Sequence, residues 1–300
     1  MDERKRVVEF FSNFRPETDN LNSVRSKYLE KIDKKDRGRF YNKVTQITRH
    51  YRLLEYIANL PLKKKQRISR KTKAALIPAL YEVFKEDKPQ HVINEYIKHV
   101  KSKNDRGFVN WVLREILRQT KGSLDNLPMP NSKIKNLALK YSFPVDLTVK
   151  ISTEFSKNQA EEMFRIMQDE SPTVFMRNYL KQSKEEHMNC KEIHPEVFEV
   201  CDTSTAYREN TEGKILMFDQ TSVFPVYISG LGKDEKILDL CASPGNKSFM
   251  MYNIMDGNID LTLNEFRKKR FKLMKDNVEK WGIKAKLMNK DGRKLKTEEK

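Results

Sequence analysis

The stretch from Lys236 to Asn289 alternates strand-like apolar runs with helical patterns, and this alternation limits the fold more than any other feature. Apolar runs at 236–240, 258–263 and 284–289 predict three strands, the first of them buried. The spacing of apolar residues at 248–255 and 266–281 predicts the helices between them. Strands connected in this way by helices pair in parallel. We therefore expect an incomplete Rossmann-like, doubly wound α/β sheet, preceded by a helix over 220–228.

The first predicted strand runs into a turn of small residues and then into a helix, between Ile237 and Ser248. Such a turn lets a cofactor approach the backbone N–H groups at the start of a helix. Glu265 ends the second strand, where a carboxylate can accept both hydroxyls of a ribose, and Asp291 follows the third. Because parallel strands end at one edge of a sheet, we expect these groups to face one crevice. Taken singly, the turn is also a common structural connection, and each acid is more often a helix cap or a surface charge.

The first 120 residues are helical almost throughout. Apolar residues recur at spacings of three and four in five segments, at 7–11, 40–57, 74–84, 93–100 and 108–117. Pro89 marks the end of the third segment. These patterns predict an all-α domain over residues 1–125, which a Pro- and Gly-containing linker follows. Residues 133–212 mix helical and strand-like runs and predict a small α+β connector, and residues 213–300 hold the α/β region.

The charge of the chain is strongly basic and unevenly distributed. Its 59 Lys and Arg residues outnumber 42 Asp and Glu residues, which gives a net charge of +17. Residues 1–130 carry +14 of this excess. Such a distribution favours a polyanionic partner for the helical domain. The alternative is that a lysine-rich surface only keeps the chain soluble.

The three cysteines, Cys190, Cys201 and Cys241, form neither a CxxC pair nor a metal-ligand spacing. We therefore expect no metal site, no disulfide framework and reduced thiols. Cys241 is predicted to be a small apolar packing residue at the end of the first buried strand. No apolar run has the length of a membrane span and the first residues lack a secretory signal, so the expected compartment is the cytoplasm.

The segment from Leu238 to Lys247 resembles the RsmB/NOP-type (Sun) RNA cytosine-5 methyltransferases, whose first strand ends in Leu-Asp-x-Cys-Ala-x-Pro-Gly-Gly-Lys. Asn246 replaces the second glycine of that motif, and Asn is the next best residue for a left-handed turn. Two further motifs of the family, Asn-Asp followed five residues later by Arg and Asp-Gly/Ala-Arg, correspond to Asn264, Glu265 and Arg270 and to Asp291-Gly292-Arg293.

The resemblance extends over nearly the whole chain. Phe218 to Ser222 is similar to the family's Gln-Asp-x-x-Ser, and Met176 to Asn178 with Ser183 to Glu186 is similar to its Arg-x-Asn insert. Four short segments resemble the NusB-like RNA-binding domain of RsmB-type members: Asp36-Arg37, Arg49, Ile93-Asn94-Glu95 and Gly107 to Arg114. The resemblance therefore implies the RsmB-like subtype with a helical domain that contacts RNA.

The family uses S-adenosylmethionine, and the resemblance implies the same cofactor here. The residues that it assigns to cofactor binding are Cys241, Ala242, Ser243, Pro244, Gly245, Asn246, Lys247, Glu265 and Asp291. The segment 241–247 would hold the methionine and sugar part, Glu265 the ribose hydroxyls and Asp291 the adenine side. The glutamate replaces an aspartate of the family and has an arm longer by one methylene.

The resemblance also implies methyl transfer to cytosine C5 of RNA, with rRNA as the expected substrate. In the family a Cys thiolate first adds to C6, which makes C5 nucleophilic. The cysteines that do this belong to later strands, so we assign no catalytic residue within this chain and expect that a second chain can complete the sheet. The alternative function is a non-catalytic NusB-like RNA-binding factor of antitermination or ribosome assembly, with a vestigial cofactor site.

Overall fold

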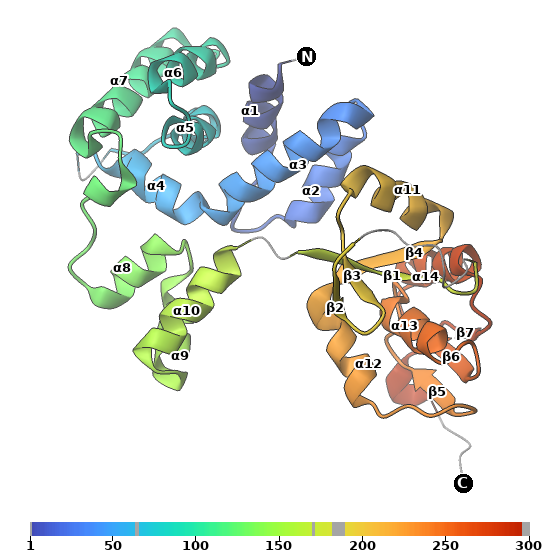
Figure 1. Ribbon diagram of the computed structural model, residues 1–300. Helices are drawn as coiled ribbons and strands as arrows, with labels where there is room; N and C mark the ends of the chain where they lie inside the picture. The colour runs from blue at the N-terminus through green and yellow to red at the C-terminus, as the bar shows by residue number, and fades with distance from the viewer. Residues whose placement is uncertain (1, 64–65, 170–171, 182–189, 296–300) are drawn as a thin grey trace. The chain divides into compact units, whose positions relative to one another are not determined.

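The computed structural model describes residues 2–63, 66–169, 172–181 and 190–295 (Figure 1). The chain divides into two compact units, residues 1–169 and residues 170–300. The boundary falls inside the segment 133–212, so the helices before residue 170 belong to the first unit, whereas the strands of that segment and the helix over 203–212 belong to the second.

The described part of the first unit is helical. Its elements are α1 (Glu3–Asn13), α2 (Leu21–Leu29), α3 (Lys34–Arg49), α4 (Tyr51–Asn59), α5 (Arg70–Val83), α6 (Pro89–Lys98), α7 (Lys103–Thr120), the 3-10 turn η1 (Leu124–Asn126), α8 (Lys133–Lys140), α9 (Val145–Glu154) and α10 (Lys157–Gln168). The five apolar segments of the sequence lie in α1, α3 to α4, α5, α6 and α7. The pattern over 40–57 covers two helices because the backbone bends at His50, where φ is −97° and ψ is 10°. The sequence did not predict α2 and α9.

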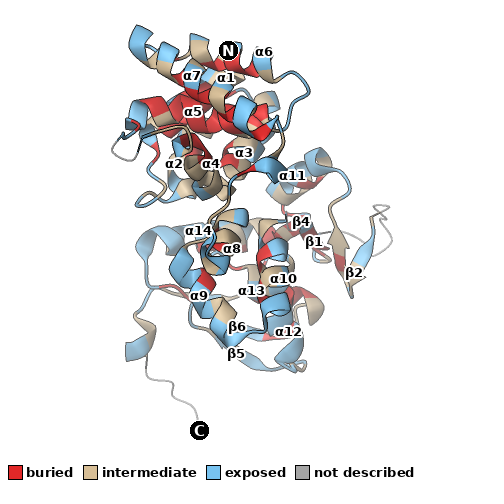
Figure 2. Cartoon of the chain, turned by 90° about the vertical axis from the view of Figure 1, so that its left-hand side faces the viewer, coloured by how far each residue is buried: buried red, intermediate tan, exposed pale blue. Residues whose placement is uncertain are grey.

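Helix α5 is the centre of the first unit (Figure 2). It packs against α1, α4, α6 and α7, and almost all of its side chains are buried. Three alanines, Ala74, Ala75 and Ala79, let neighbouring helices approach it closely. The all-α prediction for this region is therefore confirmed, with one continuous apolar core.

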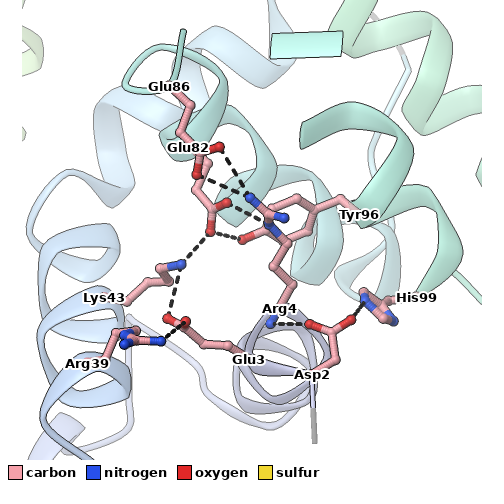
Figure 3. Close-up of polar contacts among 9 residues, drawn as sticks. All are labelled: Asp2, Glu3, Arg4, Arg39, Lys43, Glu82, Glu86, Tyr96 and His99. Atoms are coloured by element: carbon pink, nitrogen blue, oxygen red, sulfur yellow. Dashed lines mark hydrogen bonds and ion pairs between the residues drawn. The ribbon is translucent and has the colours of Figure 1, made fainter. Parts of the chain in front are cut away.

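A polar cluster joins four helices beside this core (Figure 3). Glu82 of α5 is only 3% exposed, and its carboxylate accepts hydrogen bonds from Arg4 Nε at 2.8 Å and Tyr96 Oη at 2.7 Å. Lys43 Nζ of α3 lies 2.9 Å from the same carboxylate. A buried carboxylate is tolerated when it is paired in this way, so the cluster fixes α1, α3 and α6 against α5.

The second unit contains two sheets. Its elements are β1 (Thr173–Arg177), β2 (Glu192–His194), β3 (Val197–Glu199), α11 (Thr203–Glu212), β4 (Ile215–Asp219), the 3-10 turn η2 (Gln220–Val223), α12 (Phe224–Ile228), β5 (Lys236–Asp239), α13 (Asn246–Ile254), β6 (Asp260–Asn264), α14 (Lys268–Trp281), β7 (Lys286–Met288) and the 3-10 turn η3 (Gly292–Lys294). Strands β2, β3, β1 and β4 form an antiparallel sheet in that order. Strands β5, β6 and β7 form a parallel sheet, as the alternation of strands and helices predicts.

The prediction that the first parallel strand is buried is wrong. Among the residues that the structure describes, strand β5 pairs only with β6 and lies at an edge of the sheet. Leu238 is 37% exposed and Leu240 is 45% exposed. The sequence shows that these residues are apolar, whereas their burial depends on a further layer that the described residues do not supply on this side.

The prediction of three reduced thiols is also wrong, because the structure joins Cys190 to Cys201 in a disulfide. Cys190 lies just before β2 and Cys201 lies just after β3, and these two strands pair in antiparallel register. The hairpin therefore brings the two Cα atoms to 5.6 Å, although the residues are 11 positions apart in the chain. The spacing in the sequence gives no sign of this pairing, since it depends on where the hairpin turns.

The described helices include none that combines the length and the apolar composition needed to cross a membrane. Within the same residues, no group of three or more His, Cys, Asp or Glu side chains is placed to hold a metal ion.

Candidate functional site

The carboxyl ends of β5, β6 and β7 lie at one edge of the parallel sheet, and Asn264 holds them together. This residue ends β6 and is almost fully buried. Its side-chain amide donates to the carbonyls of Leu240 and Lys290, both at 3.0 Å, and its side-chain oxygen accepts from the Lys290 N–H at 3.0 Å. One side chain thus links the segments that leave all three strands.

The segment between β5 and α13 is a tight turn closed by the last residue of the strand. Asp239 accepts hydrogen bonds from the Cys241 N–H at 3.1 Å and from Ser248 Oγ at 2.7 Å. Gly245 has φ of +108°, a conformation that L side chains rarely adopt, and a Cβ there would lie 3.4 Å from the Trp281 ring. The backbone angle therefore favours glycine, whereas the ring would be in ordinary van der Waals contact with a Cβ.

The structure corrects the expected role of Asn246. The residue with positive φ is Gly245, and Asn246 is the first residue of α13. The left-handed residue lies one position earlier, so Asn246, which replaces the family's second glycine, has an ordinary helical conformation. The substitution of asparagine for glycine therefore does not require a left-handed backbone at this position.

The structure also corrects the prediction that Cys241 is a packing residue, since this cysteine is free and exposed. It follows an edge strand, so no neighbouring strand covers it. Within the same turn Ala242, Ser243 and Gly245 are buried, whereas Pro244 and Lys247 are exposed. The predicted segment is thus a backbone turn with two buried side chains at its centre and polar or small groups at its surface.

Glu265 lies directly after β6, as predicted, and is only 7% exposed. Its Oε1 accepts from the Arg267 N–H at 2.8 Å, and Arg270 Nε lies 3.3 Å from its Oε2. Arg270 also donates from Nη2 to the Ser243 carbonyl, and Ser243 Oγ donates to the Arg270 carbonyl at 2.9 Å. Arg270 therefore connects Glu265 to the turn after β5, across 27 residues of sequence.

Asp291 follows β7 and caps η3 by accepting from the Arg293 N–H at 3.1 Å. The Arg293 guanidinium bonds both carboxylate oxygens, at 3.0 Å and 2.6 Å. The hydrogen bond from Arg293 lowers the pKa of Asp291 below its ordinary value. Asp291 is thus ionised and already paired with a side chain two residues away.

The residues at this edge suit S-adenosylmethionine in two respects. Each oxygen of the buried Glu265 carboxylate has one partner among the described residues, and a carboxylate oxygen can accept two hydrogen bonds. This leaves capacity for two ribose hydroxyls. Phe266, the next residue, is 63% exposed and offers an apolar surface for an adenine ring. Asp291 suits the cofactor less well. Its carboxylate is already paired with Arg293, and an adenine group would have to share the carboxylate with Arg293 or displace that side chain.

Sequence reasoning did not place Asn264 or Arg270 among the site residues, although both belong to a recognised motif. Their spacing around Glu265 was the available signal.

Among the upstream motifs, Asn178 is buried and donates to the carbonyls of Gly213 and Trp281 at 2.8 and 2.9 Å, which ties β1 to α14. The segment Ser183 to Glu186 lies outside the described residues.

Comparison with protein families finds two matched regions. Residues 1–118 match the NusB family, and residues 227–300 match the family described as 16S rRNA methyltransferase RsmB/F. The second region contains every residue of the cofactor-binding prediction.

Curated relatives carry related names. The chain is 24% identical over 246 residues to the "Probable ribosomal RNA small subunit methyltransferase B" of Bacillus subtilis, covering 77% of this chain and 54% of the relative. It is 25% identical over 251 residues to the "Ribosomal RNA small subunit methyltransferase B" of Shewanella oneidensis, with the same coverage of both chains. The "Ribosomal RNA small subunit methyltransferase F" of Vibrio cholerae is 33% identical over 87 residues, which are 28% of this chain and 18% of the relative. The chain therefore spans about half the length of the methyltransferase B relatives that it matches.

A solved structure, titled "Crystal Structure of PH0851", has a similar fold. It aligns with a TM-score of 0.67 over 98% of this chain and 71% of its own, at 18% sequence identity. At this identity the likeness concerns the fold alone.

Proposed function

We propose that this chain, which joins a NusB domain to part of an RsmB/F methyltransferase domain, takes part in RNA methylation with S-adenosylmethionine as the methyl donor. The main support is the meeting of Glu265 and the turn 241–247 at one edge of the parallel sheet, where Arg270 contacts both. Open α/β sheets bind their ligands at this edge.

In this proposal the chain's own residues bind and orient the cofactor. Glu265 accepts the ribose hydroxyls, and the turn from Cys241 to Lys247 holds the methionine and sugar part near the start of α13. Asp291 and Phe266 lie on the adenine side. When bound, S-adenosylmethionine supplies a methyl group activated by its sulfonium charge. Because Glu265 is buried and fixed by Arg270, its carboxylate is oriented before the cofactor arrives.

The proposed target is C5 of a cytosine in rRNA. In the reaction a Cys thiolate would bond to C6 and C5 would take the methyl group, with the demethylated cofactor as the leaving group. A base would then take the C5 proton, so that the C5–C6 double bond forms again and the thiolate leaves. We give this role to none of the three cysteines of the chain. Cys190 and Cys201 are bonded to each other, and Cys241 belongs to the cofactor turn. The nucleophile is thus proposed to lie outside these 300 residues.

Calorimetry with S-adenosylmethionine tests the cofactor site directly. We expect the complete chain to bind, and Glu265→Ala to weaken binding by about tenfold or more, since a charged hydrogen-bond acceptor is lost. Glu279→Ala is the matched control, because it removes an exposed carboxylate from the far part of α14. Equal affinity of the two variants, or no binding by the wild-type chain, would overturn the proposal.

A non-catalytic RNA-binding role, in antitermination or ribosome assembly, is the alternative. The pairing of both Asp291 oxygens with Arg293 favours it, because a cofactor would have to compete with this ion pair. The alternative expects RNA binding by the chain without any calorimetric signal from S-adenosylmethionine. The proposed function expects both.

The open edge of β5 supports a further proposal about partners, namely that additional α/β structure covers this edge in the working protein. Leu238 and Leu240 are exposed there, and Ile228, at the end of the preceding helix α12, is exposed as well. Long apolar edges associate readily with other strands. We expect the isolated chain to self-associate in light scattering, and Leu238→Lys with Leu240→Lys to reduce this. Unchanged association in the double variant would count against an interacting edge.

We propose the cytoplasm as the location, because the proposed substrate is rRNA. Disulfides are uncommon in that compartment, so the state of Cys190 and Cys201 in the purified protein bears on this part of the proposal.

A further inference from the structure

A groove of about 930 Å³ crosses the first unit between α1, the start of α5 and the connection from α6 to α7. Its walls carry several basic side chains over a small apolar floor. The lining residues used below are Lys5 and Glu9 of α1, Lys71 of α5, and Lys98, Lys101 and Asp105 around the connection from α6 to α7.

The lysines of this groove are largely unneutralised. Lys5, Lys71 and Lys101 are exposed and have no ion-pair partner among the described residues, whereas Lys98 pairs with Glu95 at 2.5 Å. Two acids also line the groove. Asp105 accepts a hydrogen bond from Thr72 Oγ1 at 3.2 Å, and Glu9 is exposed. Positive charge therefore remains in excess along the groove.

Nearby carboxylates have partners of their own (Figure 3). Asp2 lies 2.7 Å from His99 Nε2, and Glu3 lies 3.0 Å from Lys43 Nζ. Glu82 is buried beneath Arg4 and Lys43, as described above. Glu3 and Glu82 face the interior cluster and its cations, so they do not supply counter-charges for the groove lysines. Asp2 is exposed and pairs with His99, which itself lines the groove, so Asp2 offsets one of the positive charges there.

We propose that this groove binds the phosphate backbone of a single RNA strand, an inference that rests on the RNA partner in the proposed function. Lys5, Lys71 and Lys101 come from three different segments and line one open channel, an arrangement that suits an extended polyanion. The apolar floor of Val8, Ala75 and Val100 is almost fully buried, so the lysines carry the contact with the RNA. Contacts of this type position RNA without reading its sequence.

The test measures binding of the complete chain to a fluorescent single-stranded oligouridylate at several KCl concentrations. The variant Lys5→Ala/Lys71→Ala/Lys101→Ala is expected to bind about tenfold more weakly at low salt. Its plot of log affinity against log salt should be shallower by about 2, since each phosphate contact contributes about 0.7 for single strands. The matched control, Lys27→Ala/Lys31→Ala/Lys35→Ala, removes the same charge from exposed positions on and around α2 and α3.

The charge-matched control decides whether the groove matters or only the total charge. The proposal expects the control to keep most of the affinity and slope, and it is overturned if both triple variants lose the same amount or if the groove variant binds like wild type. The second variant, Glu9→Gln, changes a single exposed side chain, so we expect it to fold like the wild-type chain. It should bind the RNA about two- to threefold more tightly, because a negative charge beside the phosphates is removed. Weaker or unchanged binding by this variant also contradicts the groove.

These outcomes separate the groove from the proposed function. If the wild-type chain binds no RNA, the RNA partner itself fails. If it binds RNA but the groove and control variants behave alike, only the groove fails. Calorimetry with S-adenosylmethionine on the groove variant should match wild type, because the lysines belong to the other unit.

Discussion

Arg270 reaches from the first turns of α14 to the Glu265 carboxylate, with its Nε 3.3 Å from Oε2, and the same guanidinium donates to the Ser243 carbonyl. The ion pair therefore unites the two parts of the candidate cofactor site, the acid after β6 and the turn after β5. Arg270 is half exposed, so its contribution to stability is small, whereas its effect on the orientation of Glu265 is direct.

The first prediction follows from this contact. Arg270→Ala should raise the dissociation constant for S-adenosylmethionine by about tenfold, because the Glu265 carboxylate and the turn lose their shared donor. Titration calorimetry measures the change, and the midpoint of thermal unfolding should move little. Lys272→Ala removes an equal charge from an exposed position of the same helix and should bind like wild type. The prediction fails if the two variants bind equally well.

Asn264 should be essential to the stability of the second unit. Asn264→Ala leaves the carbonyls of Leu240 and Lys290 without their donor, and we expect a loss of about 2–4 kcal/mol in the free energy of unfolding. The chain has two tryptophans, so a Trp111→Phe background leaves the buried Trp281 as the reporter of this unit. Denaturation in urea followed by its fluorescence gives the value. Asn104→Ala, an exposed change in the first unit, should leave the transition in place.

The stability of the first unit should fall in acid through Glu82. Burial opposes ionisation of this carboxyl, but hydrogen bonds from Lys43, Tyr96 and Arg4 and the charge of Lys43 lower its pKa below the ordinary 4.5. A carboxylate whose pKa is lower in the folded state stabilises the fold above its unfolded pKa. That stabilisation is lost as the pH falls below about 4.5 and through the folded pKa.

The variant Glu82→Gln isolates this effect. It should cost about 3 kcal/mol at neutral pH, since buried cations lose their partner, and it should flatten the dependence of stability on pH between about 5 and 3. Circular dichroism of the helices during urea unfolding measures both. Glu86→Gln changes an exposed partner of Arg4 and should keep the wild-type pH dependence. An unchanged slope in Glu82→Gln would show that other acids govern the acid response.

Thiol titration tests the disulfide. The native protein should show one reactive thiol, that of the exposed Cys241, and the reduced, unfolded protein should show three. Replacing both Cys190 and Cys201 with serine should lower stability by about 2–3 kcal/mol, as expected for opening a short loop. The control Cys241→Ser should remove the native signal and leave stability unchanged. Three reactive thiols in the native protein would contradict the disulfide.

Much of the fold follows from local patterns in the sequence. The spacing of apolar residues located the five helical segments of the first unit and the order of β5, α13, β6, α14 and β7. The position of Glu265 after a strand also followed, because the carboxyl end of a strand is defined by the strand itself. The spacing of apolar residues did not predict helices such as α9. Apolar residues of this helix, including Val145 and Val149, are partly exposed and do not form a clear stripe along one face.

The amino-acid sequence by itself determined most of the helices and the parallel strands, where the basic charge lies, and which acids follow those strands. Only the tertiary structure decided that β5 is an exposed edge, that Cys190 meets Cys201, that Arg270 joins Glu265 to Ser243, and that separate lysines line one groove. The physical reason is the range of the interactions. Periodicity of apolar residues acts within a few positions of the chain, whereas burial, pairing and charge excess depend on segments that only folding brings together.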